Sequence, residues 1–205
     1  MPDSPPRYEF RIWNRDLLEL KQRLEELGIH ERSVAGTELY LISRTTDDCN
    51  AKMRGDLLEV KQLLSETRSL QQWMPVLKAP FPLEAPAIAA CLASLKAESF
   101  PLTRSAYSAS EFLNEVVARS RILAPVSISK QREIFRLDGY GAEFAAVTVA
   151  TRPDATVRHT VAIESVDADG LSELASRLDI QRYPNRSYVQ EIKRLMHLSM
   201  PEPDR

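Results

Sequence analysis

Alternation of apolar and polar residues recurs along this chain, between stretches of helical periodicity. Residues 7–13 (RYEFRIW) place Tyr8, Phe10 and Ile12 on one face and charged side chains on the other, as a two-faced strand does. The same period of two predicts further strands at 34–43, 50–55, 57–63, 126–137, 142–150 and 157–166. Helical spacing predicts helices at 17–27, 85–97, 110–120, 170–178 and 187–198. Strands and helices in this order indicate an α+β fold with mainly antiparallel pairing.

The segment from about 64 to 125 differs from the rest of the chain, because it holds six of the 13 prolines. Its clearest element is the alanine-rich stretch 85–97, which favours a helix. The segment is too short and too broken to bury a core of its own. We therefore predict a helical middle segment within a single domain over residues 1–205.

Composition excludes several classes of protein. The 27 Lys and Arg residues are balanced by 29 Asp and Glu residues, so bulk charge predicts no nucleic-acid partner. The sequence has no run of about 18 apolar residues, so we predict no membrane span. Its first residues lack the apolar core of a signal peptide. We therefore expect a cytoplasmic protein without a membrane partner. Cys49 and Cys91 are expected to be free, reduced thiols.

Charged residues occupy every second position of several predicted strands. One interpretation is a sheet face in contact with solvent. The other is a closed barrel, in which alternate residues of each strand point inward and line a lumen. The candidates for such a lumen are Arg7, Glu9, Arg11, Lys52, Arg54, Glu59, Lys61, Lys130, Arg132, Arg136, Arg158 and Glu164.

The order of these charged strands resembles the CYTH family, also called triphosphate tunnel enzymes, which includes thiamine triphosphatases and class IV adenylate cyclases. Glu9 lies where the family opens with E-x-E-x-K. The other similar segments are 52–54 (KMR) with 59–61 (EVK), 130–132 (KQR), 162–164 (AIE) and 187–188 (SY). Together they cover roughly residues 7–195.

The resemblance implies an eight-stranded antiparallel tunnel-like β-barrel with helices packed outside. It also implies a triphosphate-containing small molecule or inorganic polyphosphate as ligand. The residues implied to hold phosphate are Arg11, Lys52, Arg54, Lys61, Lys130, Arg132 and Arg136. Those implied to hold Mg²⁺ or Mn²⁺ are Glu9, Glu59 and Glu164, since hard cations prefer carboxylate oxygens.

The acidic positions depart from the family pattern more than the basic ones do. Arg7 and Ala162 stand where the family has glutamates, and Arg11 replaces its usual lysine. We find no aspartate at 143–150, where the family often has one, and interpret Glu143 as a surface acid at a strand end. These departures favour an anion pocket that has lost part of its metal site.

Three hypotheses follow from these residues. None of them identifies a catalytic residue or an oligomeric state. The first is a protein that binds triphosphate or polyphosphate-type anions in a basic lumen, without necessarily retaining catalysis. The second is a divalent-metal-dependent triphosphatase, a hydrolase of phosphoanhydrides. The third is a non-catalytic structural or interaction protein. Arg7 separates them, because an arginine inside the lumen would supply the charge that a metal ion supplies elsewhere.

Overall fold

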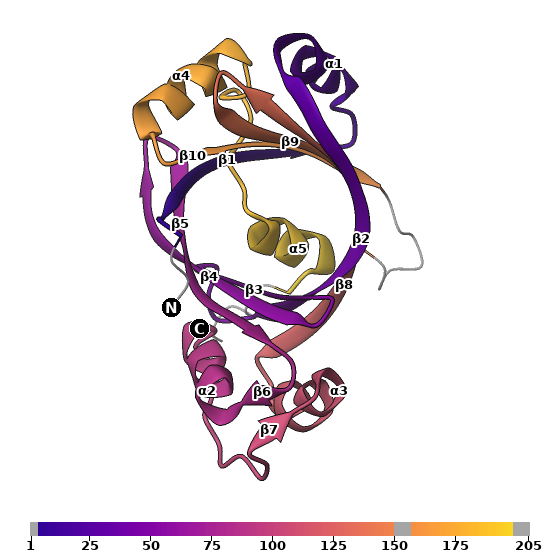
Figure 1. Cartoon of the computed structure of the whole chain (residues 1–205), viewed down its shortest axis with the longest axis vertical. Helices are drawn as coiled ribbons and strands as arrows, with labels where there is room; N and C mark the ends of the chain where they lie inside the picture. Colours follow the sequence, from indigo (N-terminus) through magenta and orange to yellow (C-terminus); the bar gives the residue numbers. More distant parts are fainter. Residues whose placement is uncertain (1–3, 150–156, 199–205) are drawn as a thin grey trace, which may run out of the picture.

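Eight antiparallel strands close into a barrel in the computed structural model, which describes residues 4–149 and 157–198 (Figure 1). The strand order around the barrel is β1-β10-β9-β8-β2-β3-β4-β5. The barrel strands are β1 (Arg7–Asn14), β2 (Ile29–Ser43), β3 (Cys49–Arg54), β4 (Leu57–Thr67), β5 (Leu70–Pro80), β8 (Leu123–Leu137), β9 (Tyr140–Val149) and β10 (Arg158–Ser165). The predicted eight-stranded antiparallel barrel is thereby confirmed. Ala150, the last residue of one predicted strand, lies outside the described residues.

Helices lie around the barrel, and one lies inside it (Figure 1). A small two-stranded sheet and two single turns complete the structure. The remaining elements are α1 (Leu18–Leu27), β6 (Leu83–Glu84), α2 (Ala85–Ser94), β7 (Ala106–Tyr107), α3 (Ala109–Glu111), a π-helical turn (Phe112–Val116), a 3₁₀ turn (Val117–Arg119), α4 (Ala168–Arg177) and α5 (Tyr188–Met196). None of the helices in the described ranges has the length and hydropathy needed to cross a bilayer.

The helical middle segment predicted for about 64–125 starts later in the structure. Residues 64–67 complete β4, and Leu70–Pro80 forms the barrel strand β5, which was not predicted. Its prolines are tolerated for two reasons. Pro75 lies beside a register shift in the pairing with β4, and β1 pairs only with residues 71–73 of β5. The N–H group that each proline lacks is therefore not needed for a hydrogen bond between neighbouring strands.

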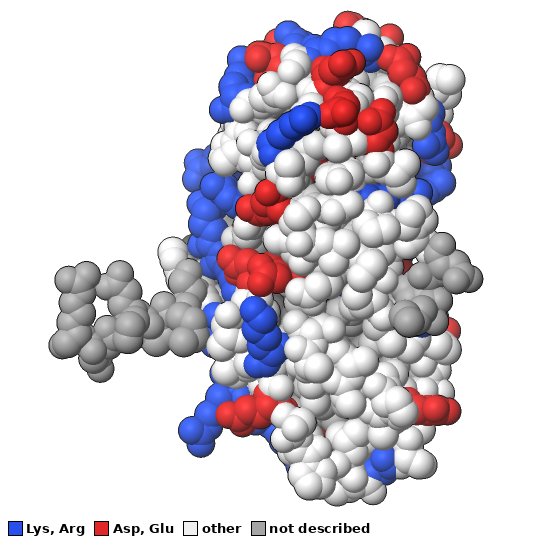
Figure 2. Space-filling model, turned by 90° about the vertical axis from the view of Figure 1, so that its left-hand side faces the viewer, with Lys and Arg blue, Asp and Glu red and all other residues white. Residues whose placement is uncertain are grey.

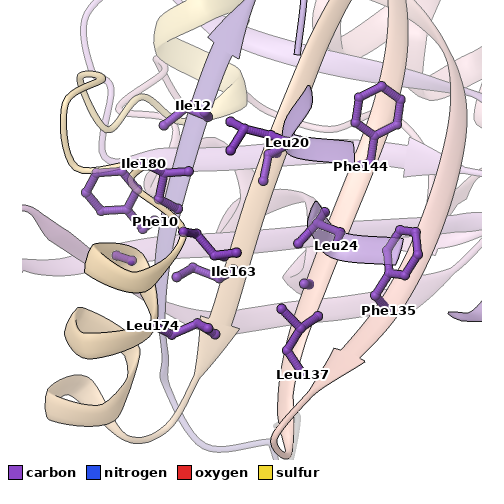
Figure 3. Close-up of a cluster of buried hydrophobic side chains, with 14 of the residues drawn as sticks. Phe10, Ile12, Leu20, Leu24, Phe135, Leu137, Phe144, Ile163, Leu174 and Ile180 are labelled. Atoms are coloured by element: carbon purple, nitrogen blue, oxygen red, sulfur yellow. The ribbon is translucent and has the colours of Figure 1, made fainter. Parts of the chain in front are cut away.

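The hydrophobic cores lie mainly outside the barrel. On one side, α1 and α4 cover the outer faces of β1, β8, β9 and β10, where one buried cluster includes Phe10, Leu24, Phe135 and Ile163 (Figure 3). On the other side, α2 and the turns after α3 cover β3 and β4. Both free cysteines are buried here. Because the apolar residues face outward into these cores, the alternate residues face inward.

The helix α5 closes one end of the barrel from the inside (Figure 1). The Ser187 hydroxyl caps the N-terminus of the helix by accepting a hydrogen bond from the Gln190 backbone N–H, and the Gln190 side-chain oxygen accepts one from the Ser187 backbone N–H. This capping box fixes the start of the helix. Val189 and Ile192 are buried against inward-facing residues of β2, β8 and β9.

The outer surface beside α2 carries few charges. Figure 2 shows charged side chains gathered at the top and along one margin of this face, with mostly uncharged surface below. The helix α2 contributes to this because Ala85–Ser94 holds no charged residue.

Candidate functional site

The barrel encloses a cavity of about 430 Å³, here called the lumen, which all eight strands and α5 line. Its size is in the range of small-molecule pockets. The nine basic side chains in its wall are Arg7, Arg11, Arg32, Lys52, Arg54, Lys61, Lys78, Lys130 and Arg132. The four acidic ones are Glu9, Glu59, Glu143 and Glu164. The lumen is thus strongly positive in a chain whose formal net charge is −2.

The inward faces of the strands change from apolar to charged partway along the barrel. On β8, Ile128 packs near α5, and the next two residues on that face, Lys130 and Arg132, line the lumen. On β9, Val147 packs near α5, whereas Glu143 lines the lumen. The apolar end holds the helix, and the charged end forms a cup of which α5 is the floor.

Glu143 joins two arginines in the wall of the lumen. Arg11 Nη1 donates to one carboxylate oxygen at 3.1 Å, and Arg132 Nε donates to the other at 2.7 Å. Arg11 also holds Glu9 through two hydrogen bonds of 3.0 and 3.2 Å. Burial by itself raises the pKa of Glu143, but the charges of Arg11 and Arg132 outweigh burial and lower that pKa to about 2. The carboxylate is therefore ionised at neutral pH.

Ala162 lies between the partners of this network. It pairs with Arg11 of β1 on one side and with Glu143 of β9 on the other. Because the Ala162 side chain is only a methyl group, the space above β10 stays open, and Arg11 reaches Glu143 through it. The carboxylate that the closing motif lacks at Ala162 is therefore present one strand away, at Glu143.

A second buried network surrounds Glu38. Lys130 Nζ lies 2.5 Å from Glu38 Oε2 and donates to the Tyr40 hydroxyl at 2.6 Å. Lys52 Nζ lies 3.4 Å from both Glu38 oxygens. Burial raises the pKa of Glu38, but Lys52 and Lys130 outweigh burial and lower it to about 2. Burial and the charge of Lys52 lower the pKa of Lys130 to about 7, although Glu38 opposes them.

Tyr188, the first residue of α5, forms the floor of the lumen. Lys130 Nζ lies 3.8 Å from its ring centroid, and Arg11 Cζ lies 4.6 Å from it. Both distances are typical of cation–π contacts. The Tyr188 hydroxyl and Asn50 Oδ1 in the wall are buried, and neither has a hydrogen-bond partner in the part of the chain that the structure describes. Buried polar atoms are normally paired, so these two atoms are free to bond a ligand.

The charges at the open end of the lumen are more exposed. Arg7 Nη1 donates to Glu164 at 2.9 Å, and Arg54 Nη2 donates to both oxygens of Glu59 at 2.8 and 2.9 Å. Arg7, the residue that separates the three hypotheses, lines the lumen. Within residues 4–149 and 157–198, no hydrogen bond or ion pair engages the side chains of Lys61 and Arg32. These two cations are available to an anion.

The three glutamates implied as metal ligands do not fit a resident divalent cation. Each is held by a different arginine: Glu9 by Arg11, Glu59 by Arg54 and Glu164 by Arg7. In the described part of the chain, no three His, Cys, Asp or Glu side chains are grouped as a metal site requires. A Mg²⁺ or Mn²⁺ ion would have to displace guanidinium groups that already satisfy these carboxylates.

Six of the seven implied phosphate ligands line the lumen: Arg11, Lys52, Arg54, Lys61, Lys130 and Arg132. The seventh, Arg136, lies on the same strand face but beyond the lumen. It bonds Glu31 at 2.9 Å, and its side chain is 48% exposed. Arg158, predicted for the lumen, instead lines a separate cavity beside α5. The interpretation of Glu143 as a surface acid was wrong, because its side chain is 11% exposed within the lumen network.

Several residues that line the lumen or bond its side chains were missed in the sequence. Glu38 shares a strand face with Tyr40, so the same alternation would have placed it inside. Lys78 and Trp73 belong to the unpredicted strand β5. Arg32 precedes the predicted start of its strand at residue 34. Tyr188 was noted only as part of a helix start, and no local pattern indicates that α5 enters the barrel.

Structural comparison shows what this fold is similar to. A conserved hypothetical protein from Pyrococcus furiosus matches with a TM-score of 0.50 and 17% identity, over 88% of this chain and 98% of its own. The PH1012 protein from Pyrococcus horikoshii OT3 matches with a TM-score of 0.51 and 13% identity, over 88% and 97%. These likenesses support the barrel fold that the resemblance to the CYTH family implied. No family model and no curated protein matches the sequence.

Proposed function

We propose that this chain is a divergent member of the CYTH family that binds a triphosphate or polyphosphate-type anion in its lumen without a divalent cation. The observation that carries the proposal is the pairing of charges in the lumen. Nine basic side chains line it, and arginines occupy all three carboxylates that a metal ion would need. A chain of phosphates supplies the opposite charge in the form that arginine forks bind best.

In this proposal the acidic residues stabilise the protein when no ligand is bound. Nine cations in one cavity repel one another, and burial makes that repulsion stronger than in water. Glu38 and Glu143 hold Lys130, Arg11 and Arg132 in place until a ligand enters. Lys61 and Arg32, which have no such partner among the described residues, would be the first to meet a phosphate group at the open end.

A matched pair of arginines on β8 tests the proposal. Calorimetric titration with tripolyphosphate in EDTA should show binding that Arg132→Gln weakens about tenfold or more, the loss expected for one charge-assisted fork. Arg136→Gln removes the same charge from the same strand but outside the lumen, so its affinity should match that of the wild type. Equal losses in the two variants would show that only overall charge matters.

The same titration repeated with Mn²⁺ or Mg²⁺ separates the remaining hypotheses. Binding that requires the metal, together with phosphate release that Glu59→Gln abolishes, would replace the proposal with a metal-dependent triphosphatase. Absence of binding in either condition would leave a structural or interaction protein. Affinity that is unchanged or weaker in the presence of metal supports the proposal.

A further inference from the structure

A second cavity, separate from the lumen, lies at the α5 end of the barrel. Its volume is about 220 Å³. The end of β1, the start of β10 and the outer side of α5 form it. The lining residues are Trp13, Asn14, Arg15, Arg158, Glu191 and Arg194.

Positive charge dominates this cavity. Three arginines line it, against Glu191 as the single acid. Glu191 is itself shared, because Arg194 donates to both of its oxygens at 2.6 and 2.9 Å, and Arg186 donates to one at 3.1 Å. The Glu191 carboxylate therefore already pairs with the guanidinium groups of Arg186 and Arg194. It cannot also neutralise Arg15 and Arg158.

Arg158 is the least satisfied of these cations. Its Nη1 atom is buried and makes no hydrogen bond to any residue within 4–149 and 157–198. Burial lowers the pKa of Arg158, and the charges of Arg15 and Arg194 lower it further. No ion pair to another described residue engages the Arg15 side chain. A buried guanidinium nitrogen without an acceptor costs free energy, and an anion in the cavity would recover that cost.

Aromatic residues separate the second cavity from the lumen. Trp13 lines the cavity, Tyr188 lines the lumen, and their rings meet edge to face with centroids 4.8 Å apart. Trp13 Nε1 also donates to the Arg186 carbonyl at 2.8 Å, which fixes the indole against the start of α5. The helix thus presents Tyr188 to one cavity and Glu191 with Arg194 to the other.

We infer that this second cavity binds a single phosphate group, either free orthophosphate or the terminal phosphate of a monoester. Two guanidinium groups with unused donors, from Arg15 and Arg158, suit the several oxygens of a dianion. The cavity has about half the volume of the lumen, which suits one phosphate group better than a chain of three. This site uses none of the lumen residues, so it goes beyond the proposed function.

The two tryptophans of the chain allow the two cavities to be followed separately. Trp13 lines the second cavity and Trp73 lines the lumen, and the sequence holds no other tryptophan. In full-length Trp73→Phe protein, orthophosphate at constant ionic strength should change Trp13 fluorescence saturably. Adding Arg158→Gln should weaken that response about tenfold or more. Adding Arg132→Gln, a lumen change, should leave it unaltered.

The opposite pattern, loss with Arg132→Gln and persistence with Arg158→Gln, would overturn the inference because Trp13 would then report only on the lumen. An equal response to chloride or acetate would also overturn it, since it would show charge screening without phosphate recognition. Glycerol 3-phosphate in place of orthophosphate distinguishes the two sources. Comparable affinity indicates a site for a phosphate monoester, and binding of orthophosphate alone indicates a site for the free anion.

Calorimetry on protein with both tryptophans guards against a folding defect in the Trp73→Phe background. Orthophosphate should bind, and Arg158→Gln should remove one binding event that Arg132→Gln leaves in place. Arg158→Lys, which keeps the charge but loses the fork, should retain part of the affinity. If Arg158→Gln leaves both stoichiometry and affinity unchanged, the inference fails whatever the lumen binds.

Discussion

The Arg11 guanidinium and the Glu143 carboxylate lie 3.1 Å apart although their strands, β1 and β9, are not neighbours in the barrel. The contact crosses β10 above Ala162, which pairs with both residues. A larger side chain at position 162 would stand between them. The small residue and the distant ion pair therefore depend on each other.

A glutamate at position 162, where the CYTH pattern has one, should weaken anion binding. Ala162→Glu places a carboxylate beside Arg11, in competition with both Glu143 and a phosphate ligand. Ala162→Gln has the same bulk without the charge and serves as the control. We expect Ala162→Glu to lower tripolyphosphate affinity in EDTA at least tenfold more than Ala162→Gln, measured by calorimetry. Equal affinities in the two variants would mean that bulk alone matters here.

Removal of Arg11 should destabilise the fold strongly. Arg11→Met leaves Glu9 and Glu143 without a shared partner, and breaking a buried pair costs about 3–5 kcal/mol of unfolding free energy. Arg136→Met breaks the exposed pair with Glu31 and should cost at most about 1 kcal/mol. Urea unfolding measures both. In the Arg11→Met background, Glu143→Gln should cost less than it does alone; strictly additive losses would contradict the coupling.

Tyr188→Phe should separate binding from stability. The Tyr188 hydroxyl is buried and has no hydrogen-bond partner among the described residues, so its removal should leave the unfolding free energy unchanged or raise it slightly. If the hydroxyl bonds a ligand in the lumen, tripolyphosphate affinity should fall roughly three- to tenfold, the worth of about 1 kcal/mol. Thermal unfolding and calorimetry on the same samples provide the two measurements. A loss of stability with unchanged affinity would show that the hydroxyl is a structural group.

Stability should fall in acid because two buried carboxylates have lowered pKa values. The folded pKa is about 2 for both Glu38 and Glu143, against an ordinary value of 4.5. Their contribution is complete above pH 4.5 and is lost as the pH falls toward 2. Each is worth about 3 kcal/mol by linkage. Urea unfolding from pH 5 to pH 2.5 should show this decline, and Glu143→Gln should make it shallower.

Lys130 should make anion binding depend on pH near neutrality. Its pKa of about 7 means that the side chain loses its charge as the pH rises through 7. Tripolyphosphate affinity should therefore fall more between pH 6 and 8 in the wild type than in Lys130→Met, which removes the titrating group. Lys61→Met should bind more weakly at every pH but keep the pH dependence of the wild type. A Lys130→Met profile parallel to the wild-type profile would exclude this role.

The sequence by itself determined which residues share a face on most strands, and left open whether that face meets solvent or lines a lumen. Lys52 with Arg54 and Lys130 with Arg132, which were lumen candidates, do line the lumen, because alternation has a period of two within one strand and needs no knowledge of the neighbours. The same rule failed at Arg136, since periodicity does not say where along a strand the lumen ends. It also failed at β5, because its two prolines argue against a strand in the sequence. The structure accommodates them through a register shift and through an edge that β1 does not pair.

Only the tertiary structure decided which charges meet. Closure of the barrel sets the register that brings Arg11 to Glu143 across Ala162 and Lys130 to Glu38, over sequence separations of 132 and 92 residues. It also brings α5 into the barrel, so that Tyr188 forms the floor of one cavity and Arg194 the wall of another. Strand order and register are long-range properties that no local pattern of residues contains. The basic residues were therefore predictable one by one, and their partners were not.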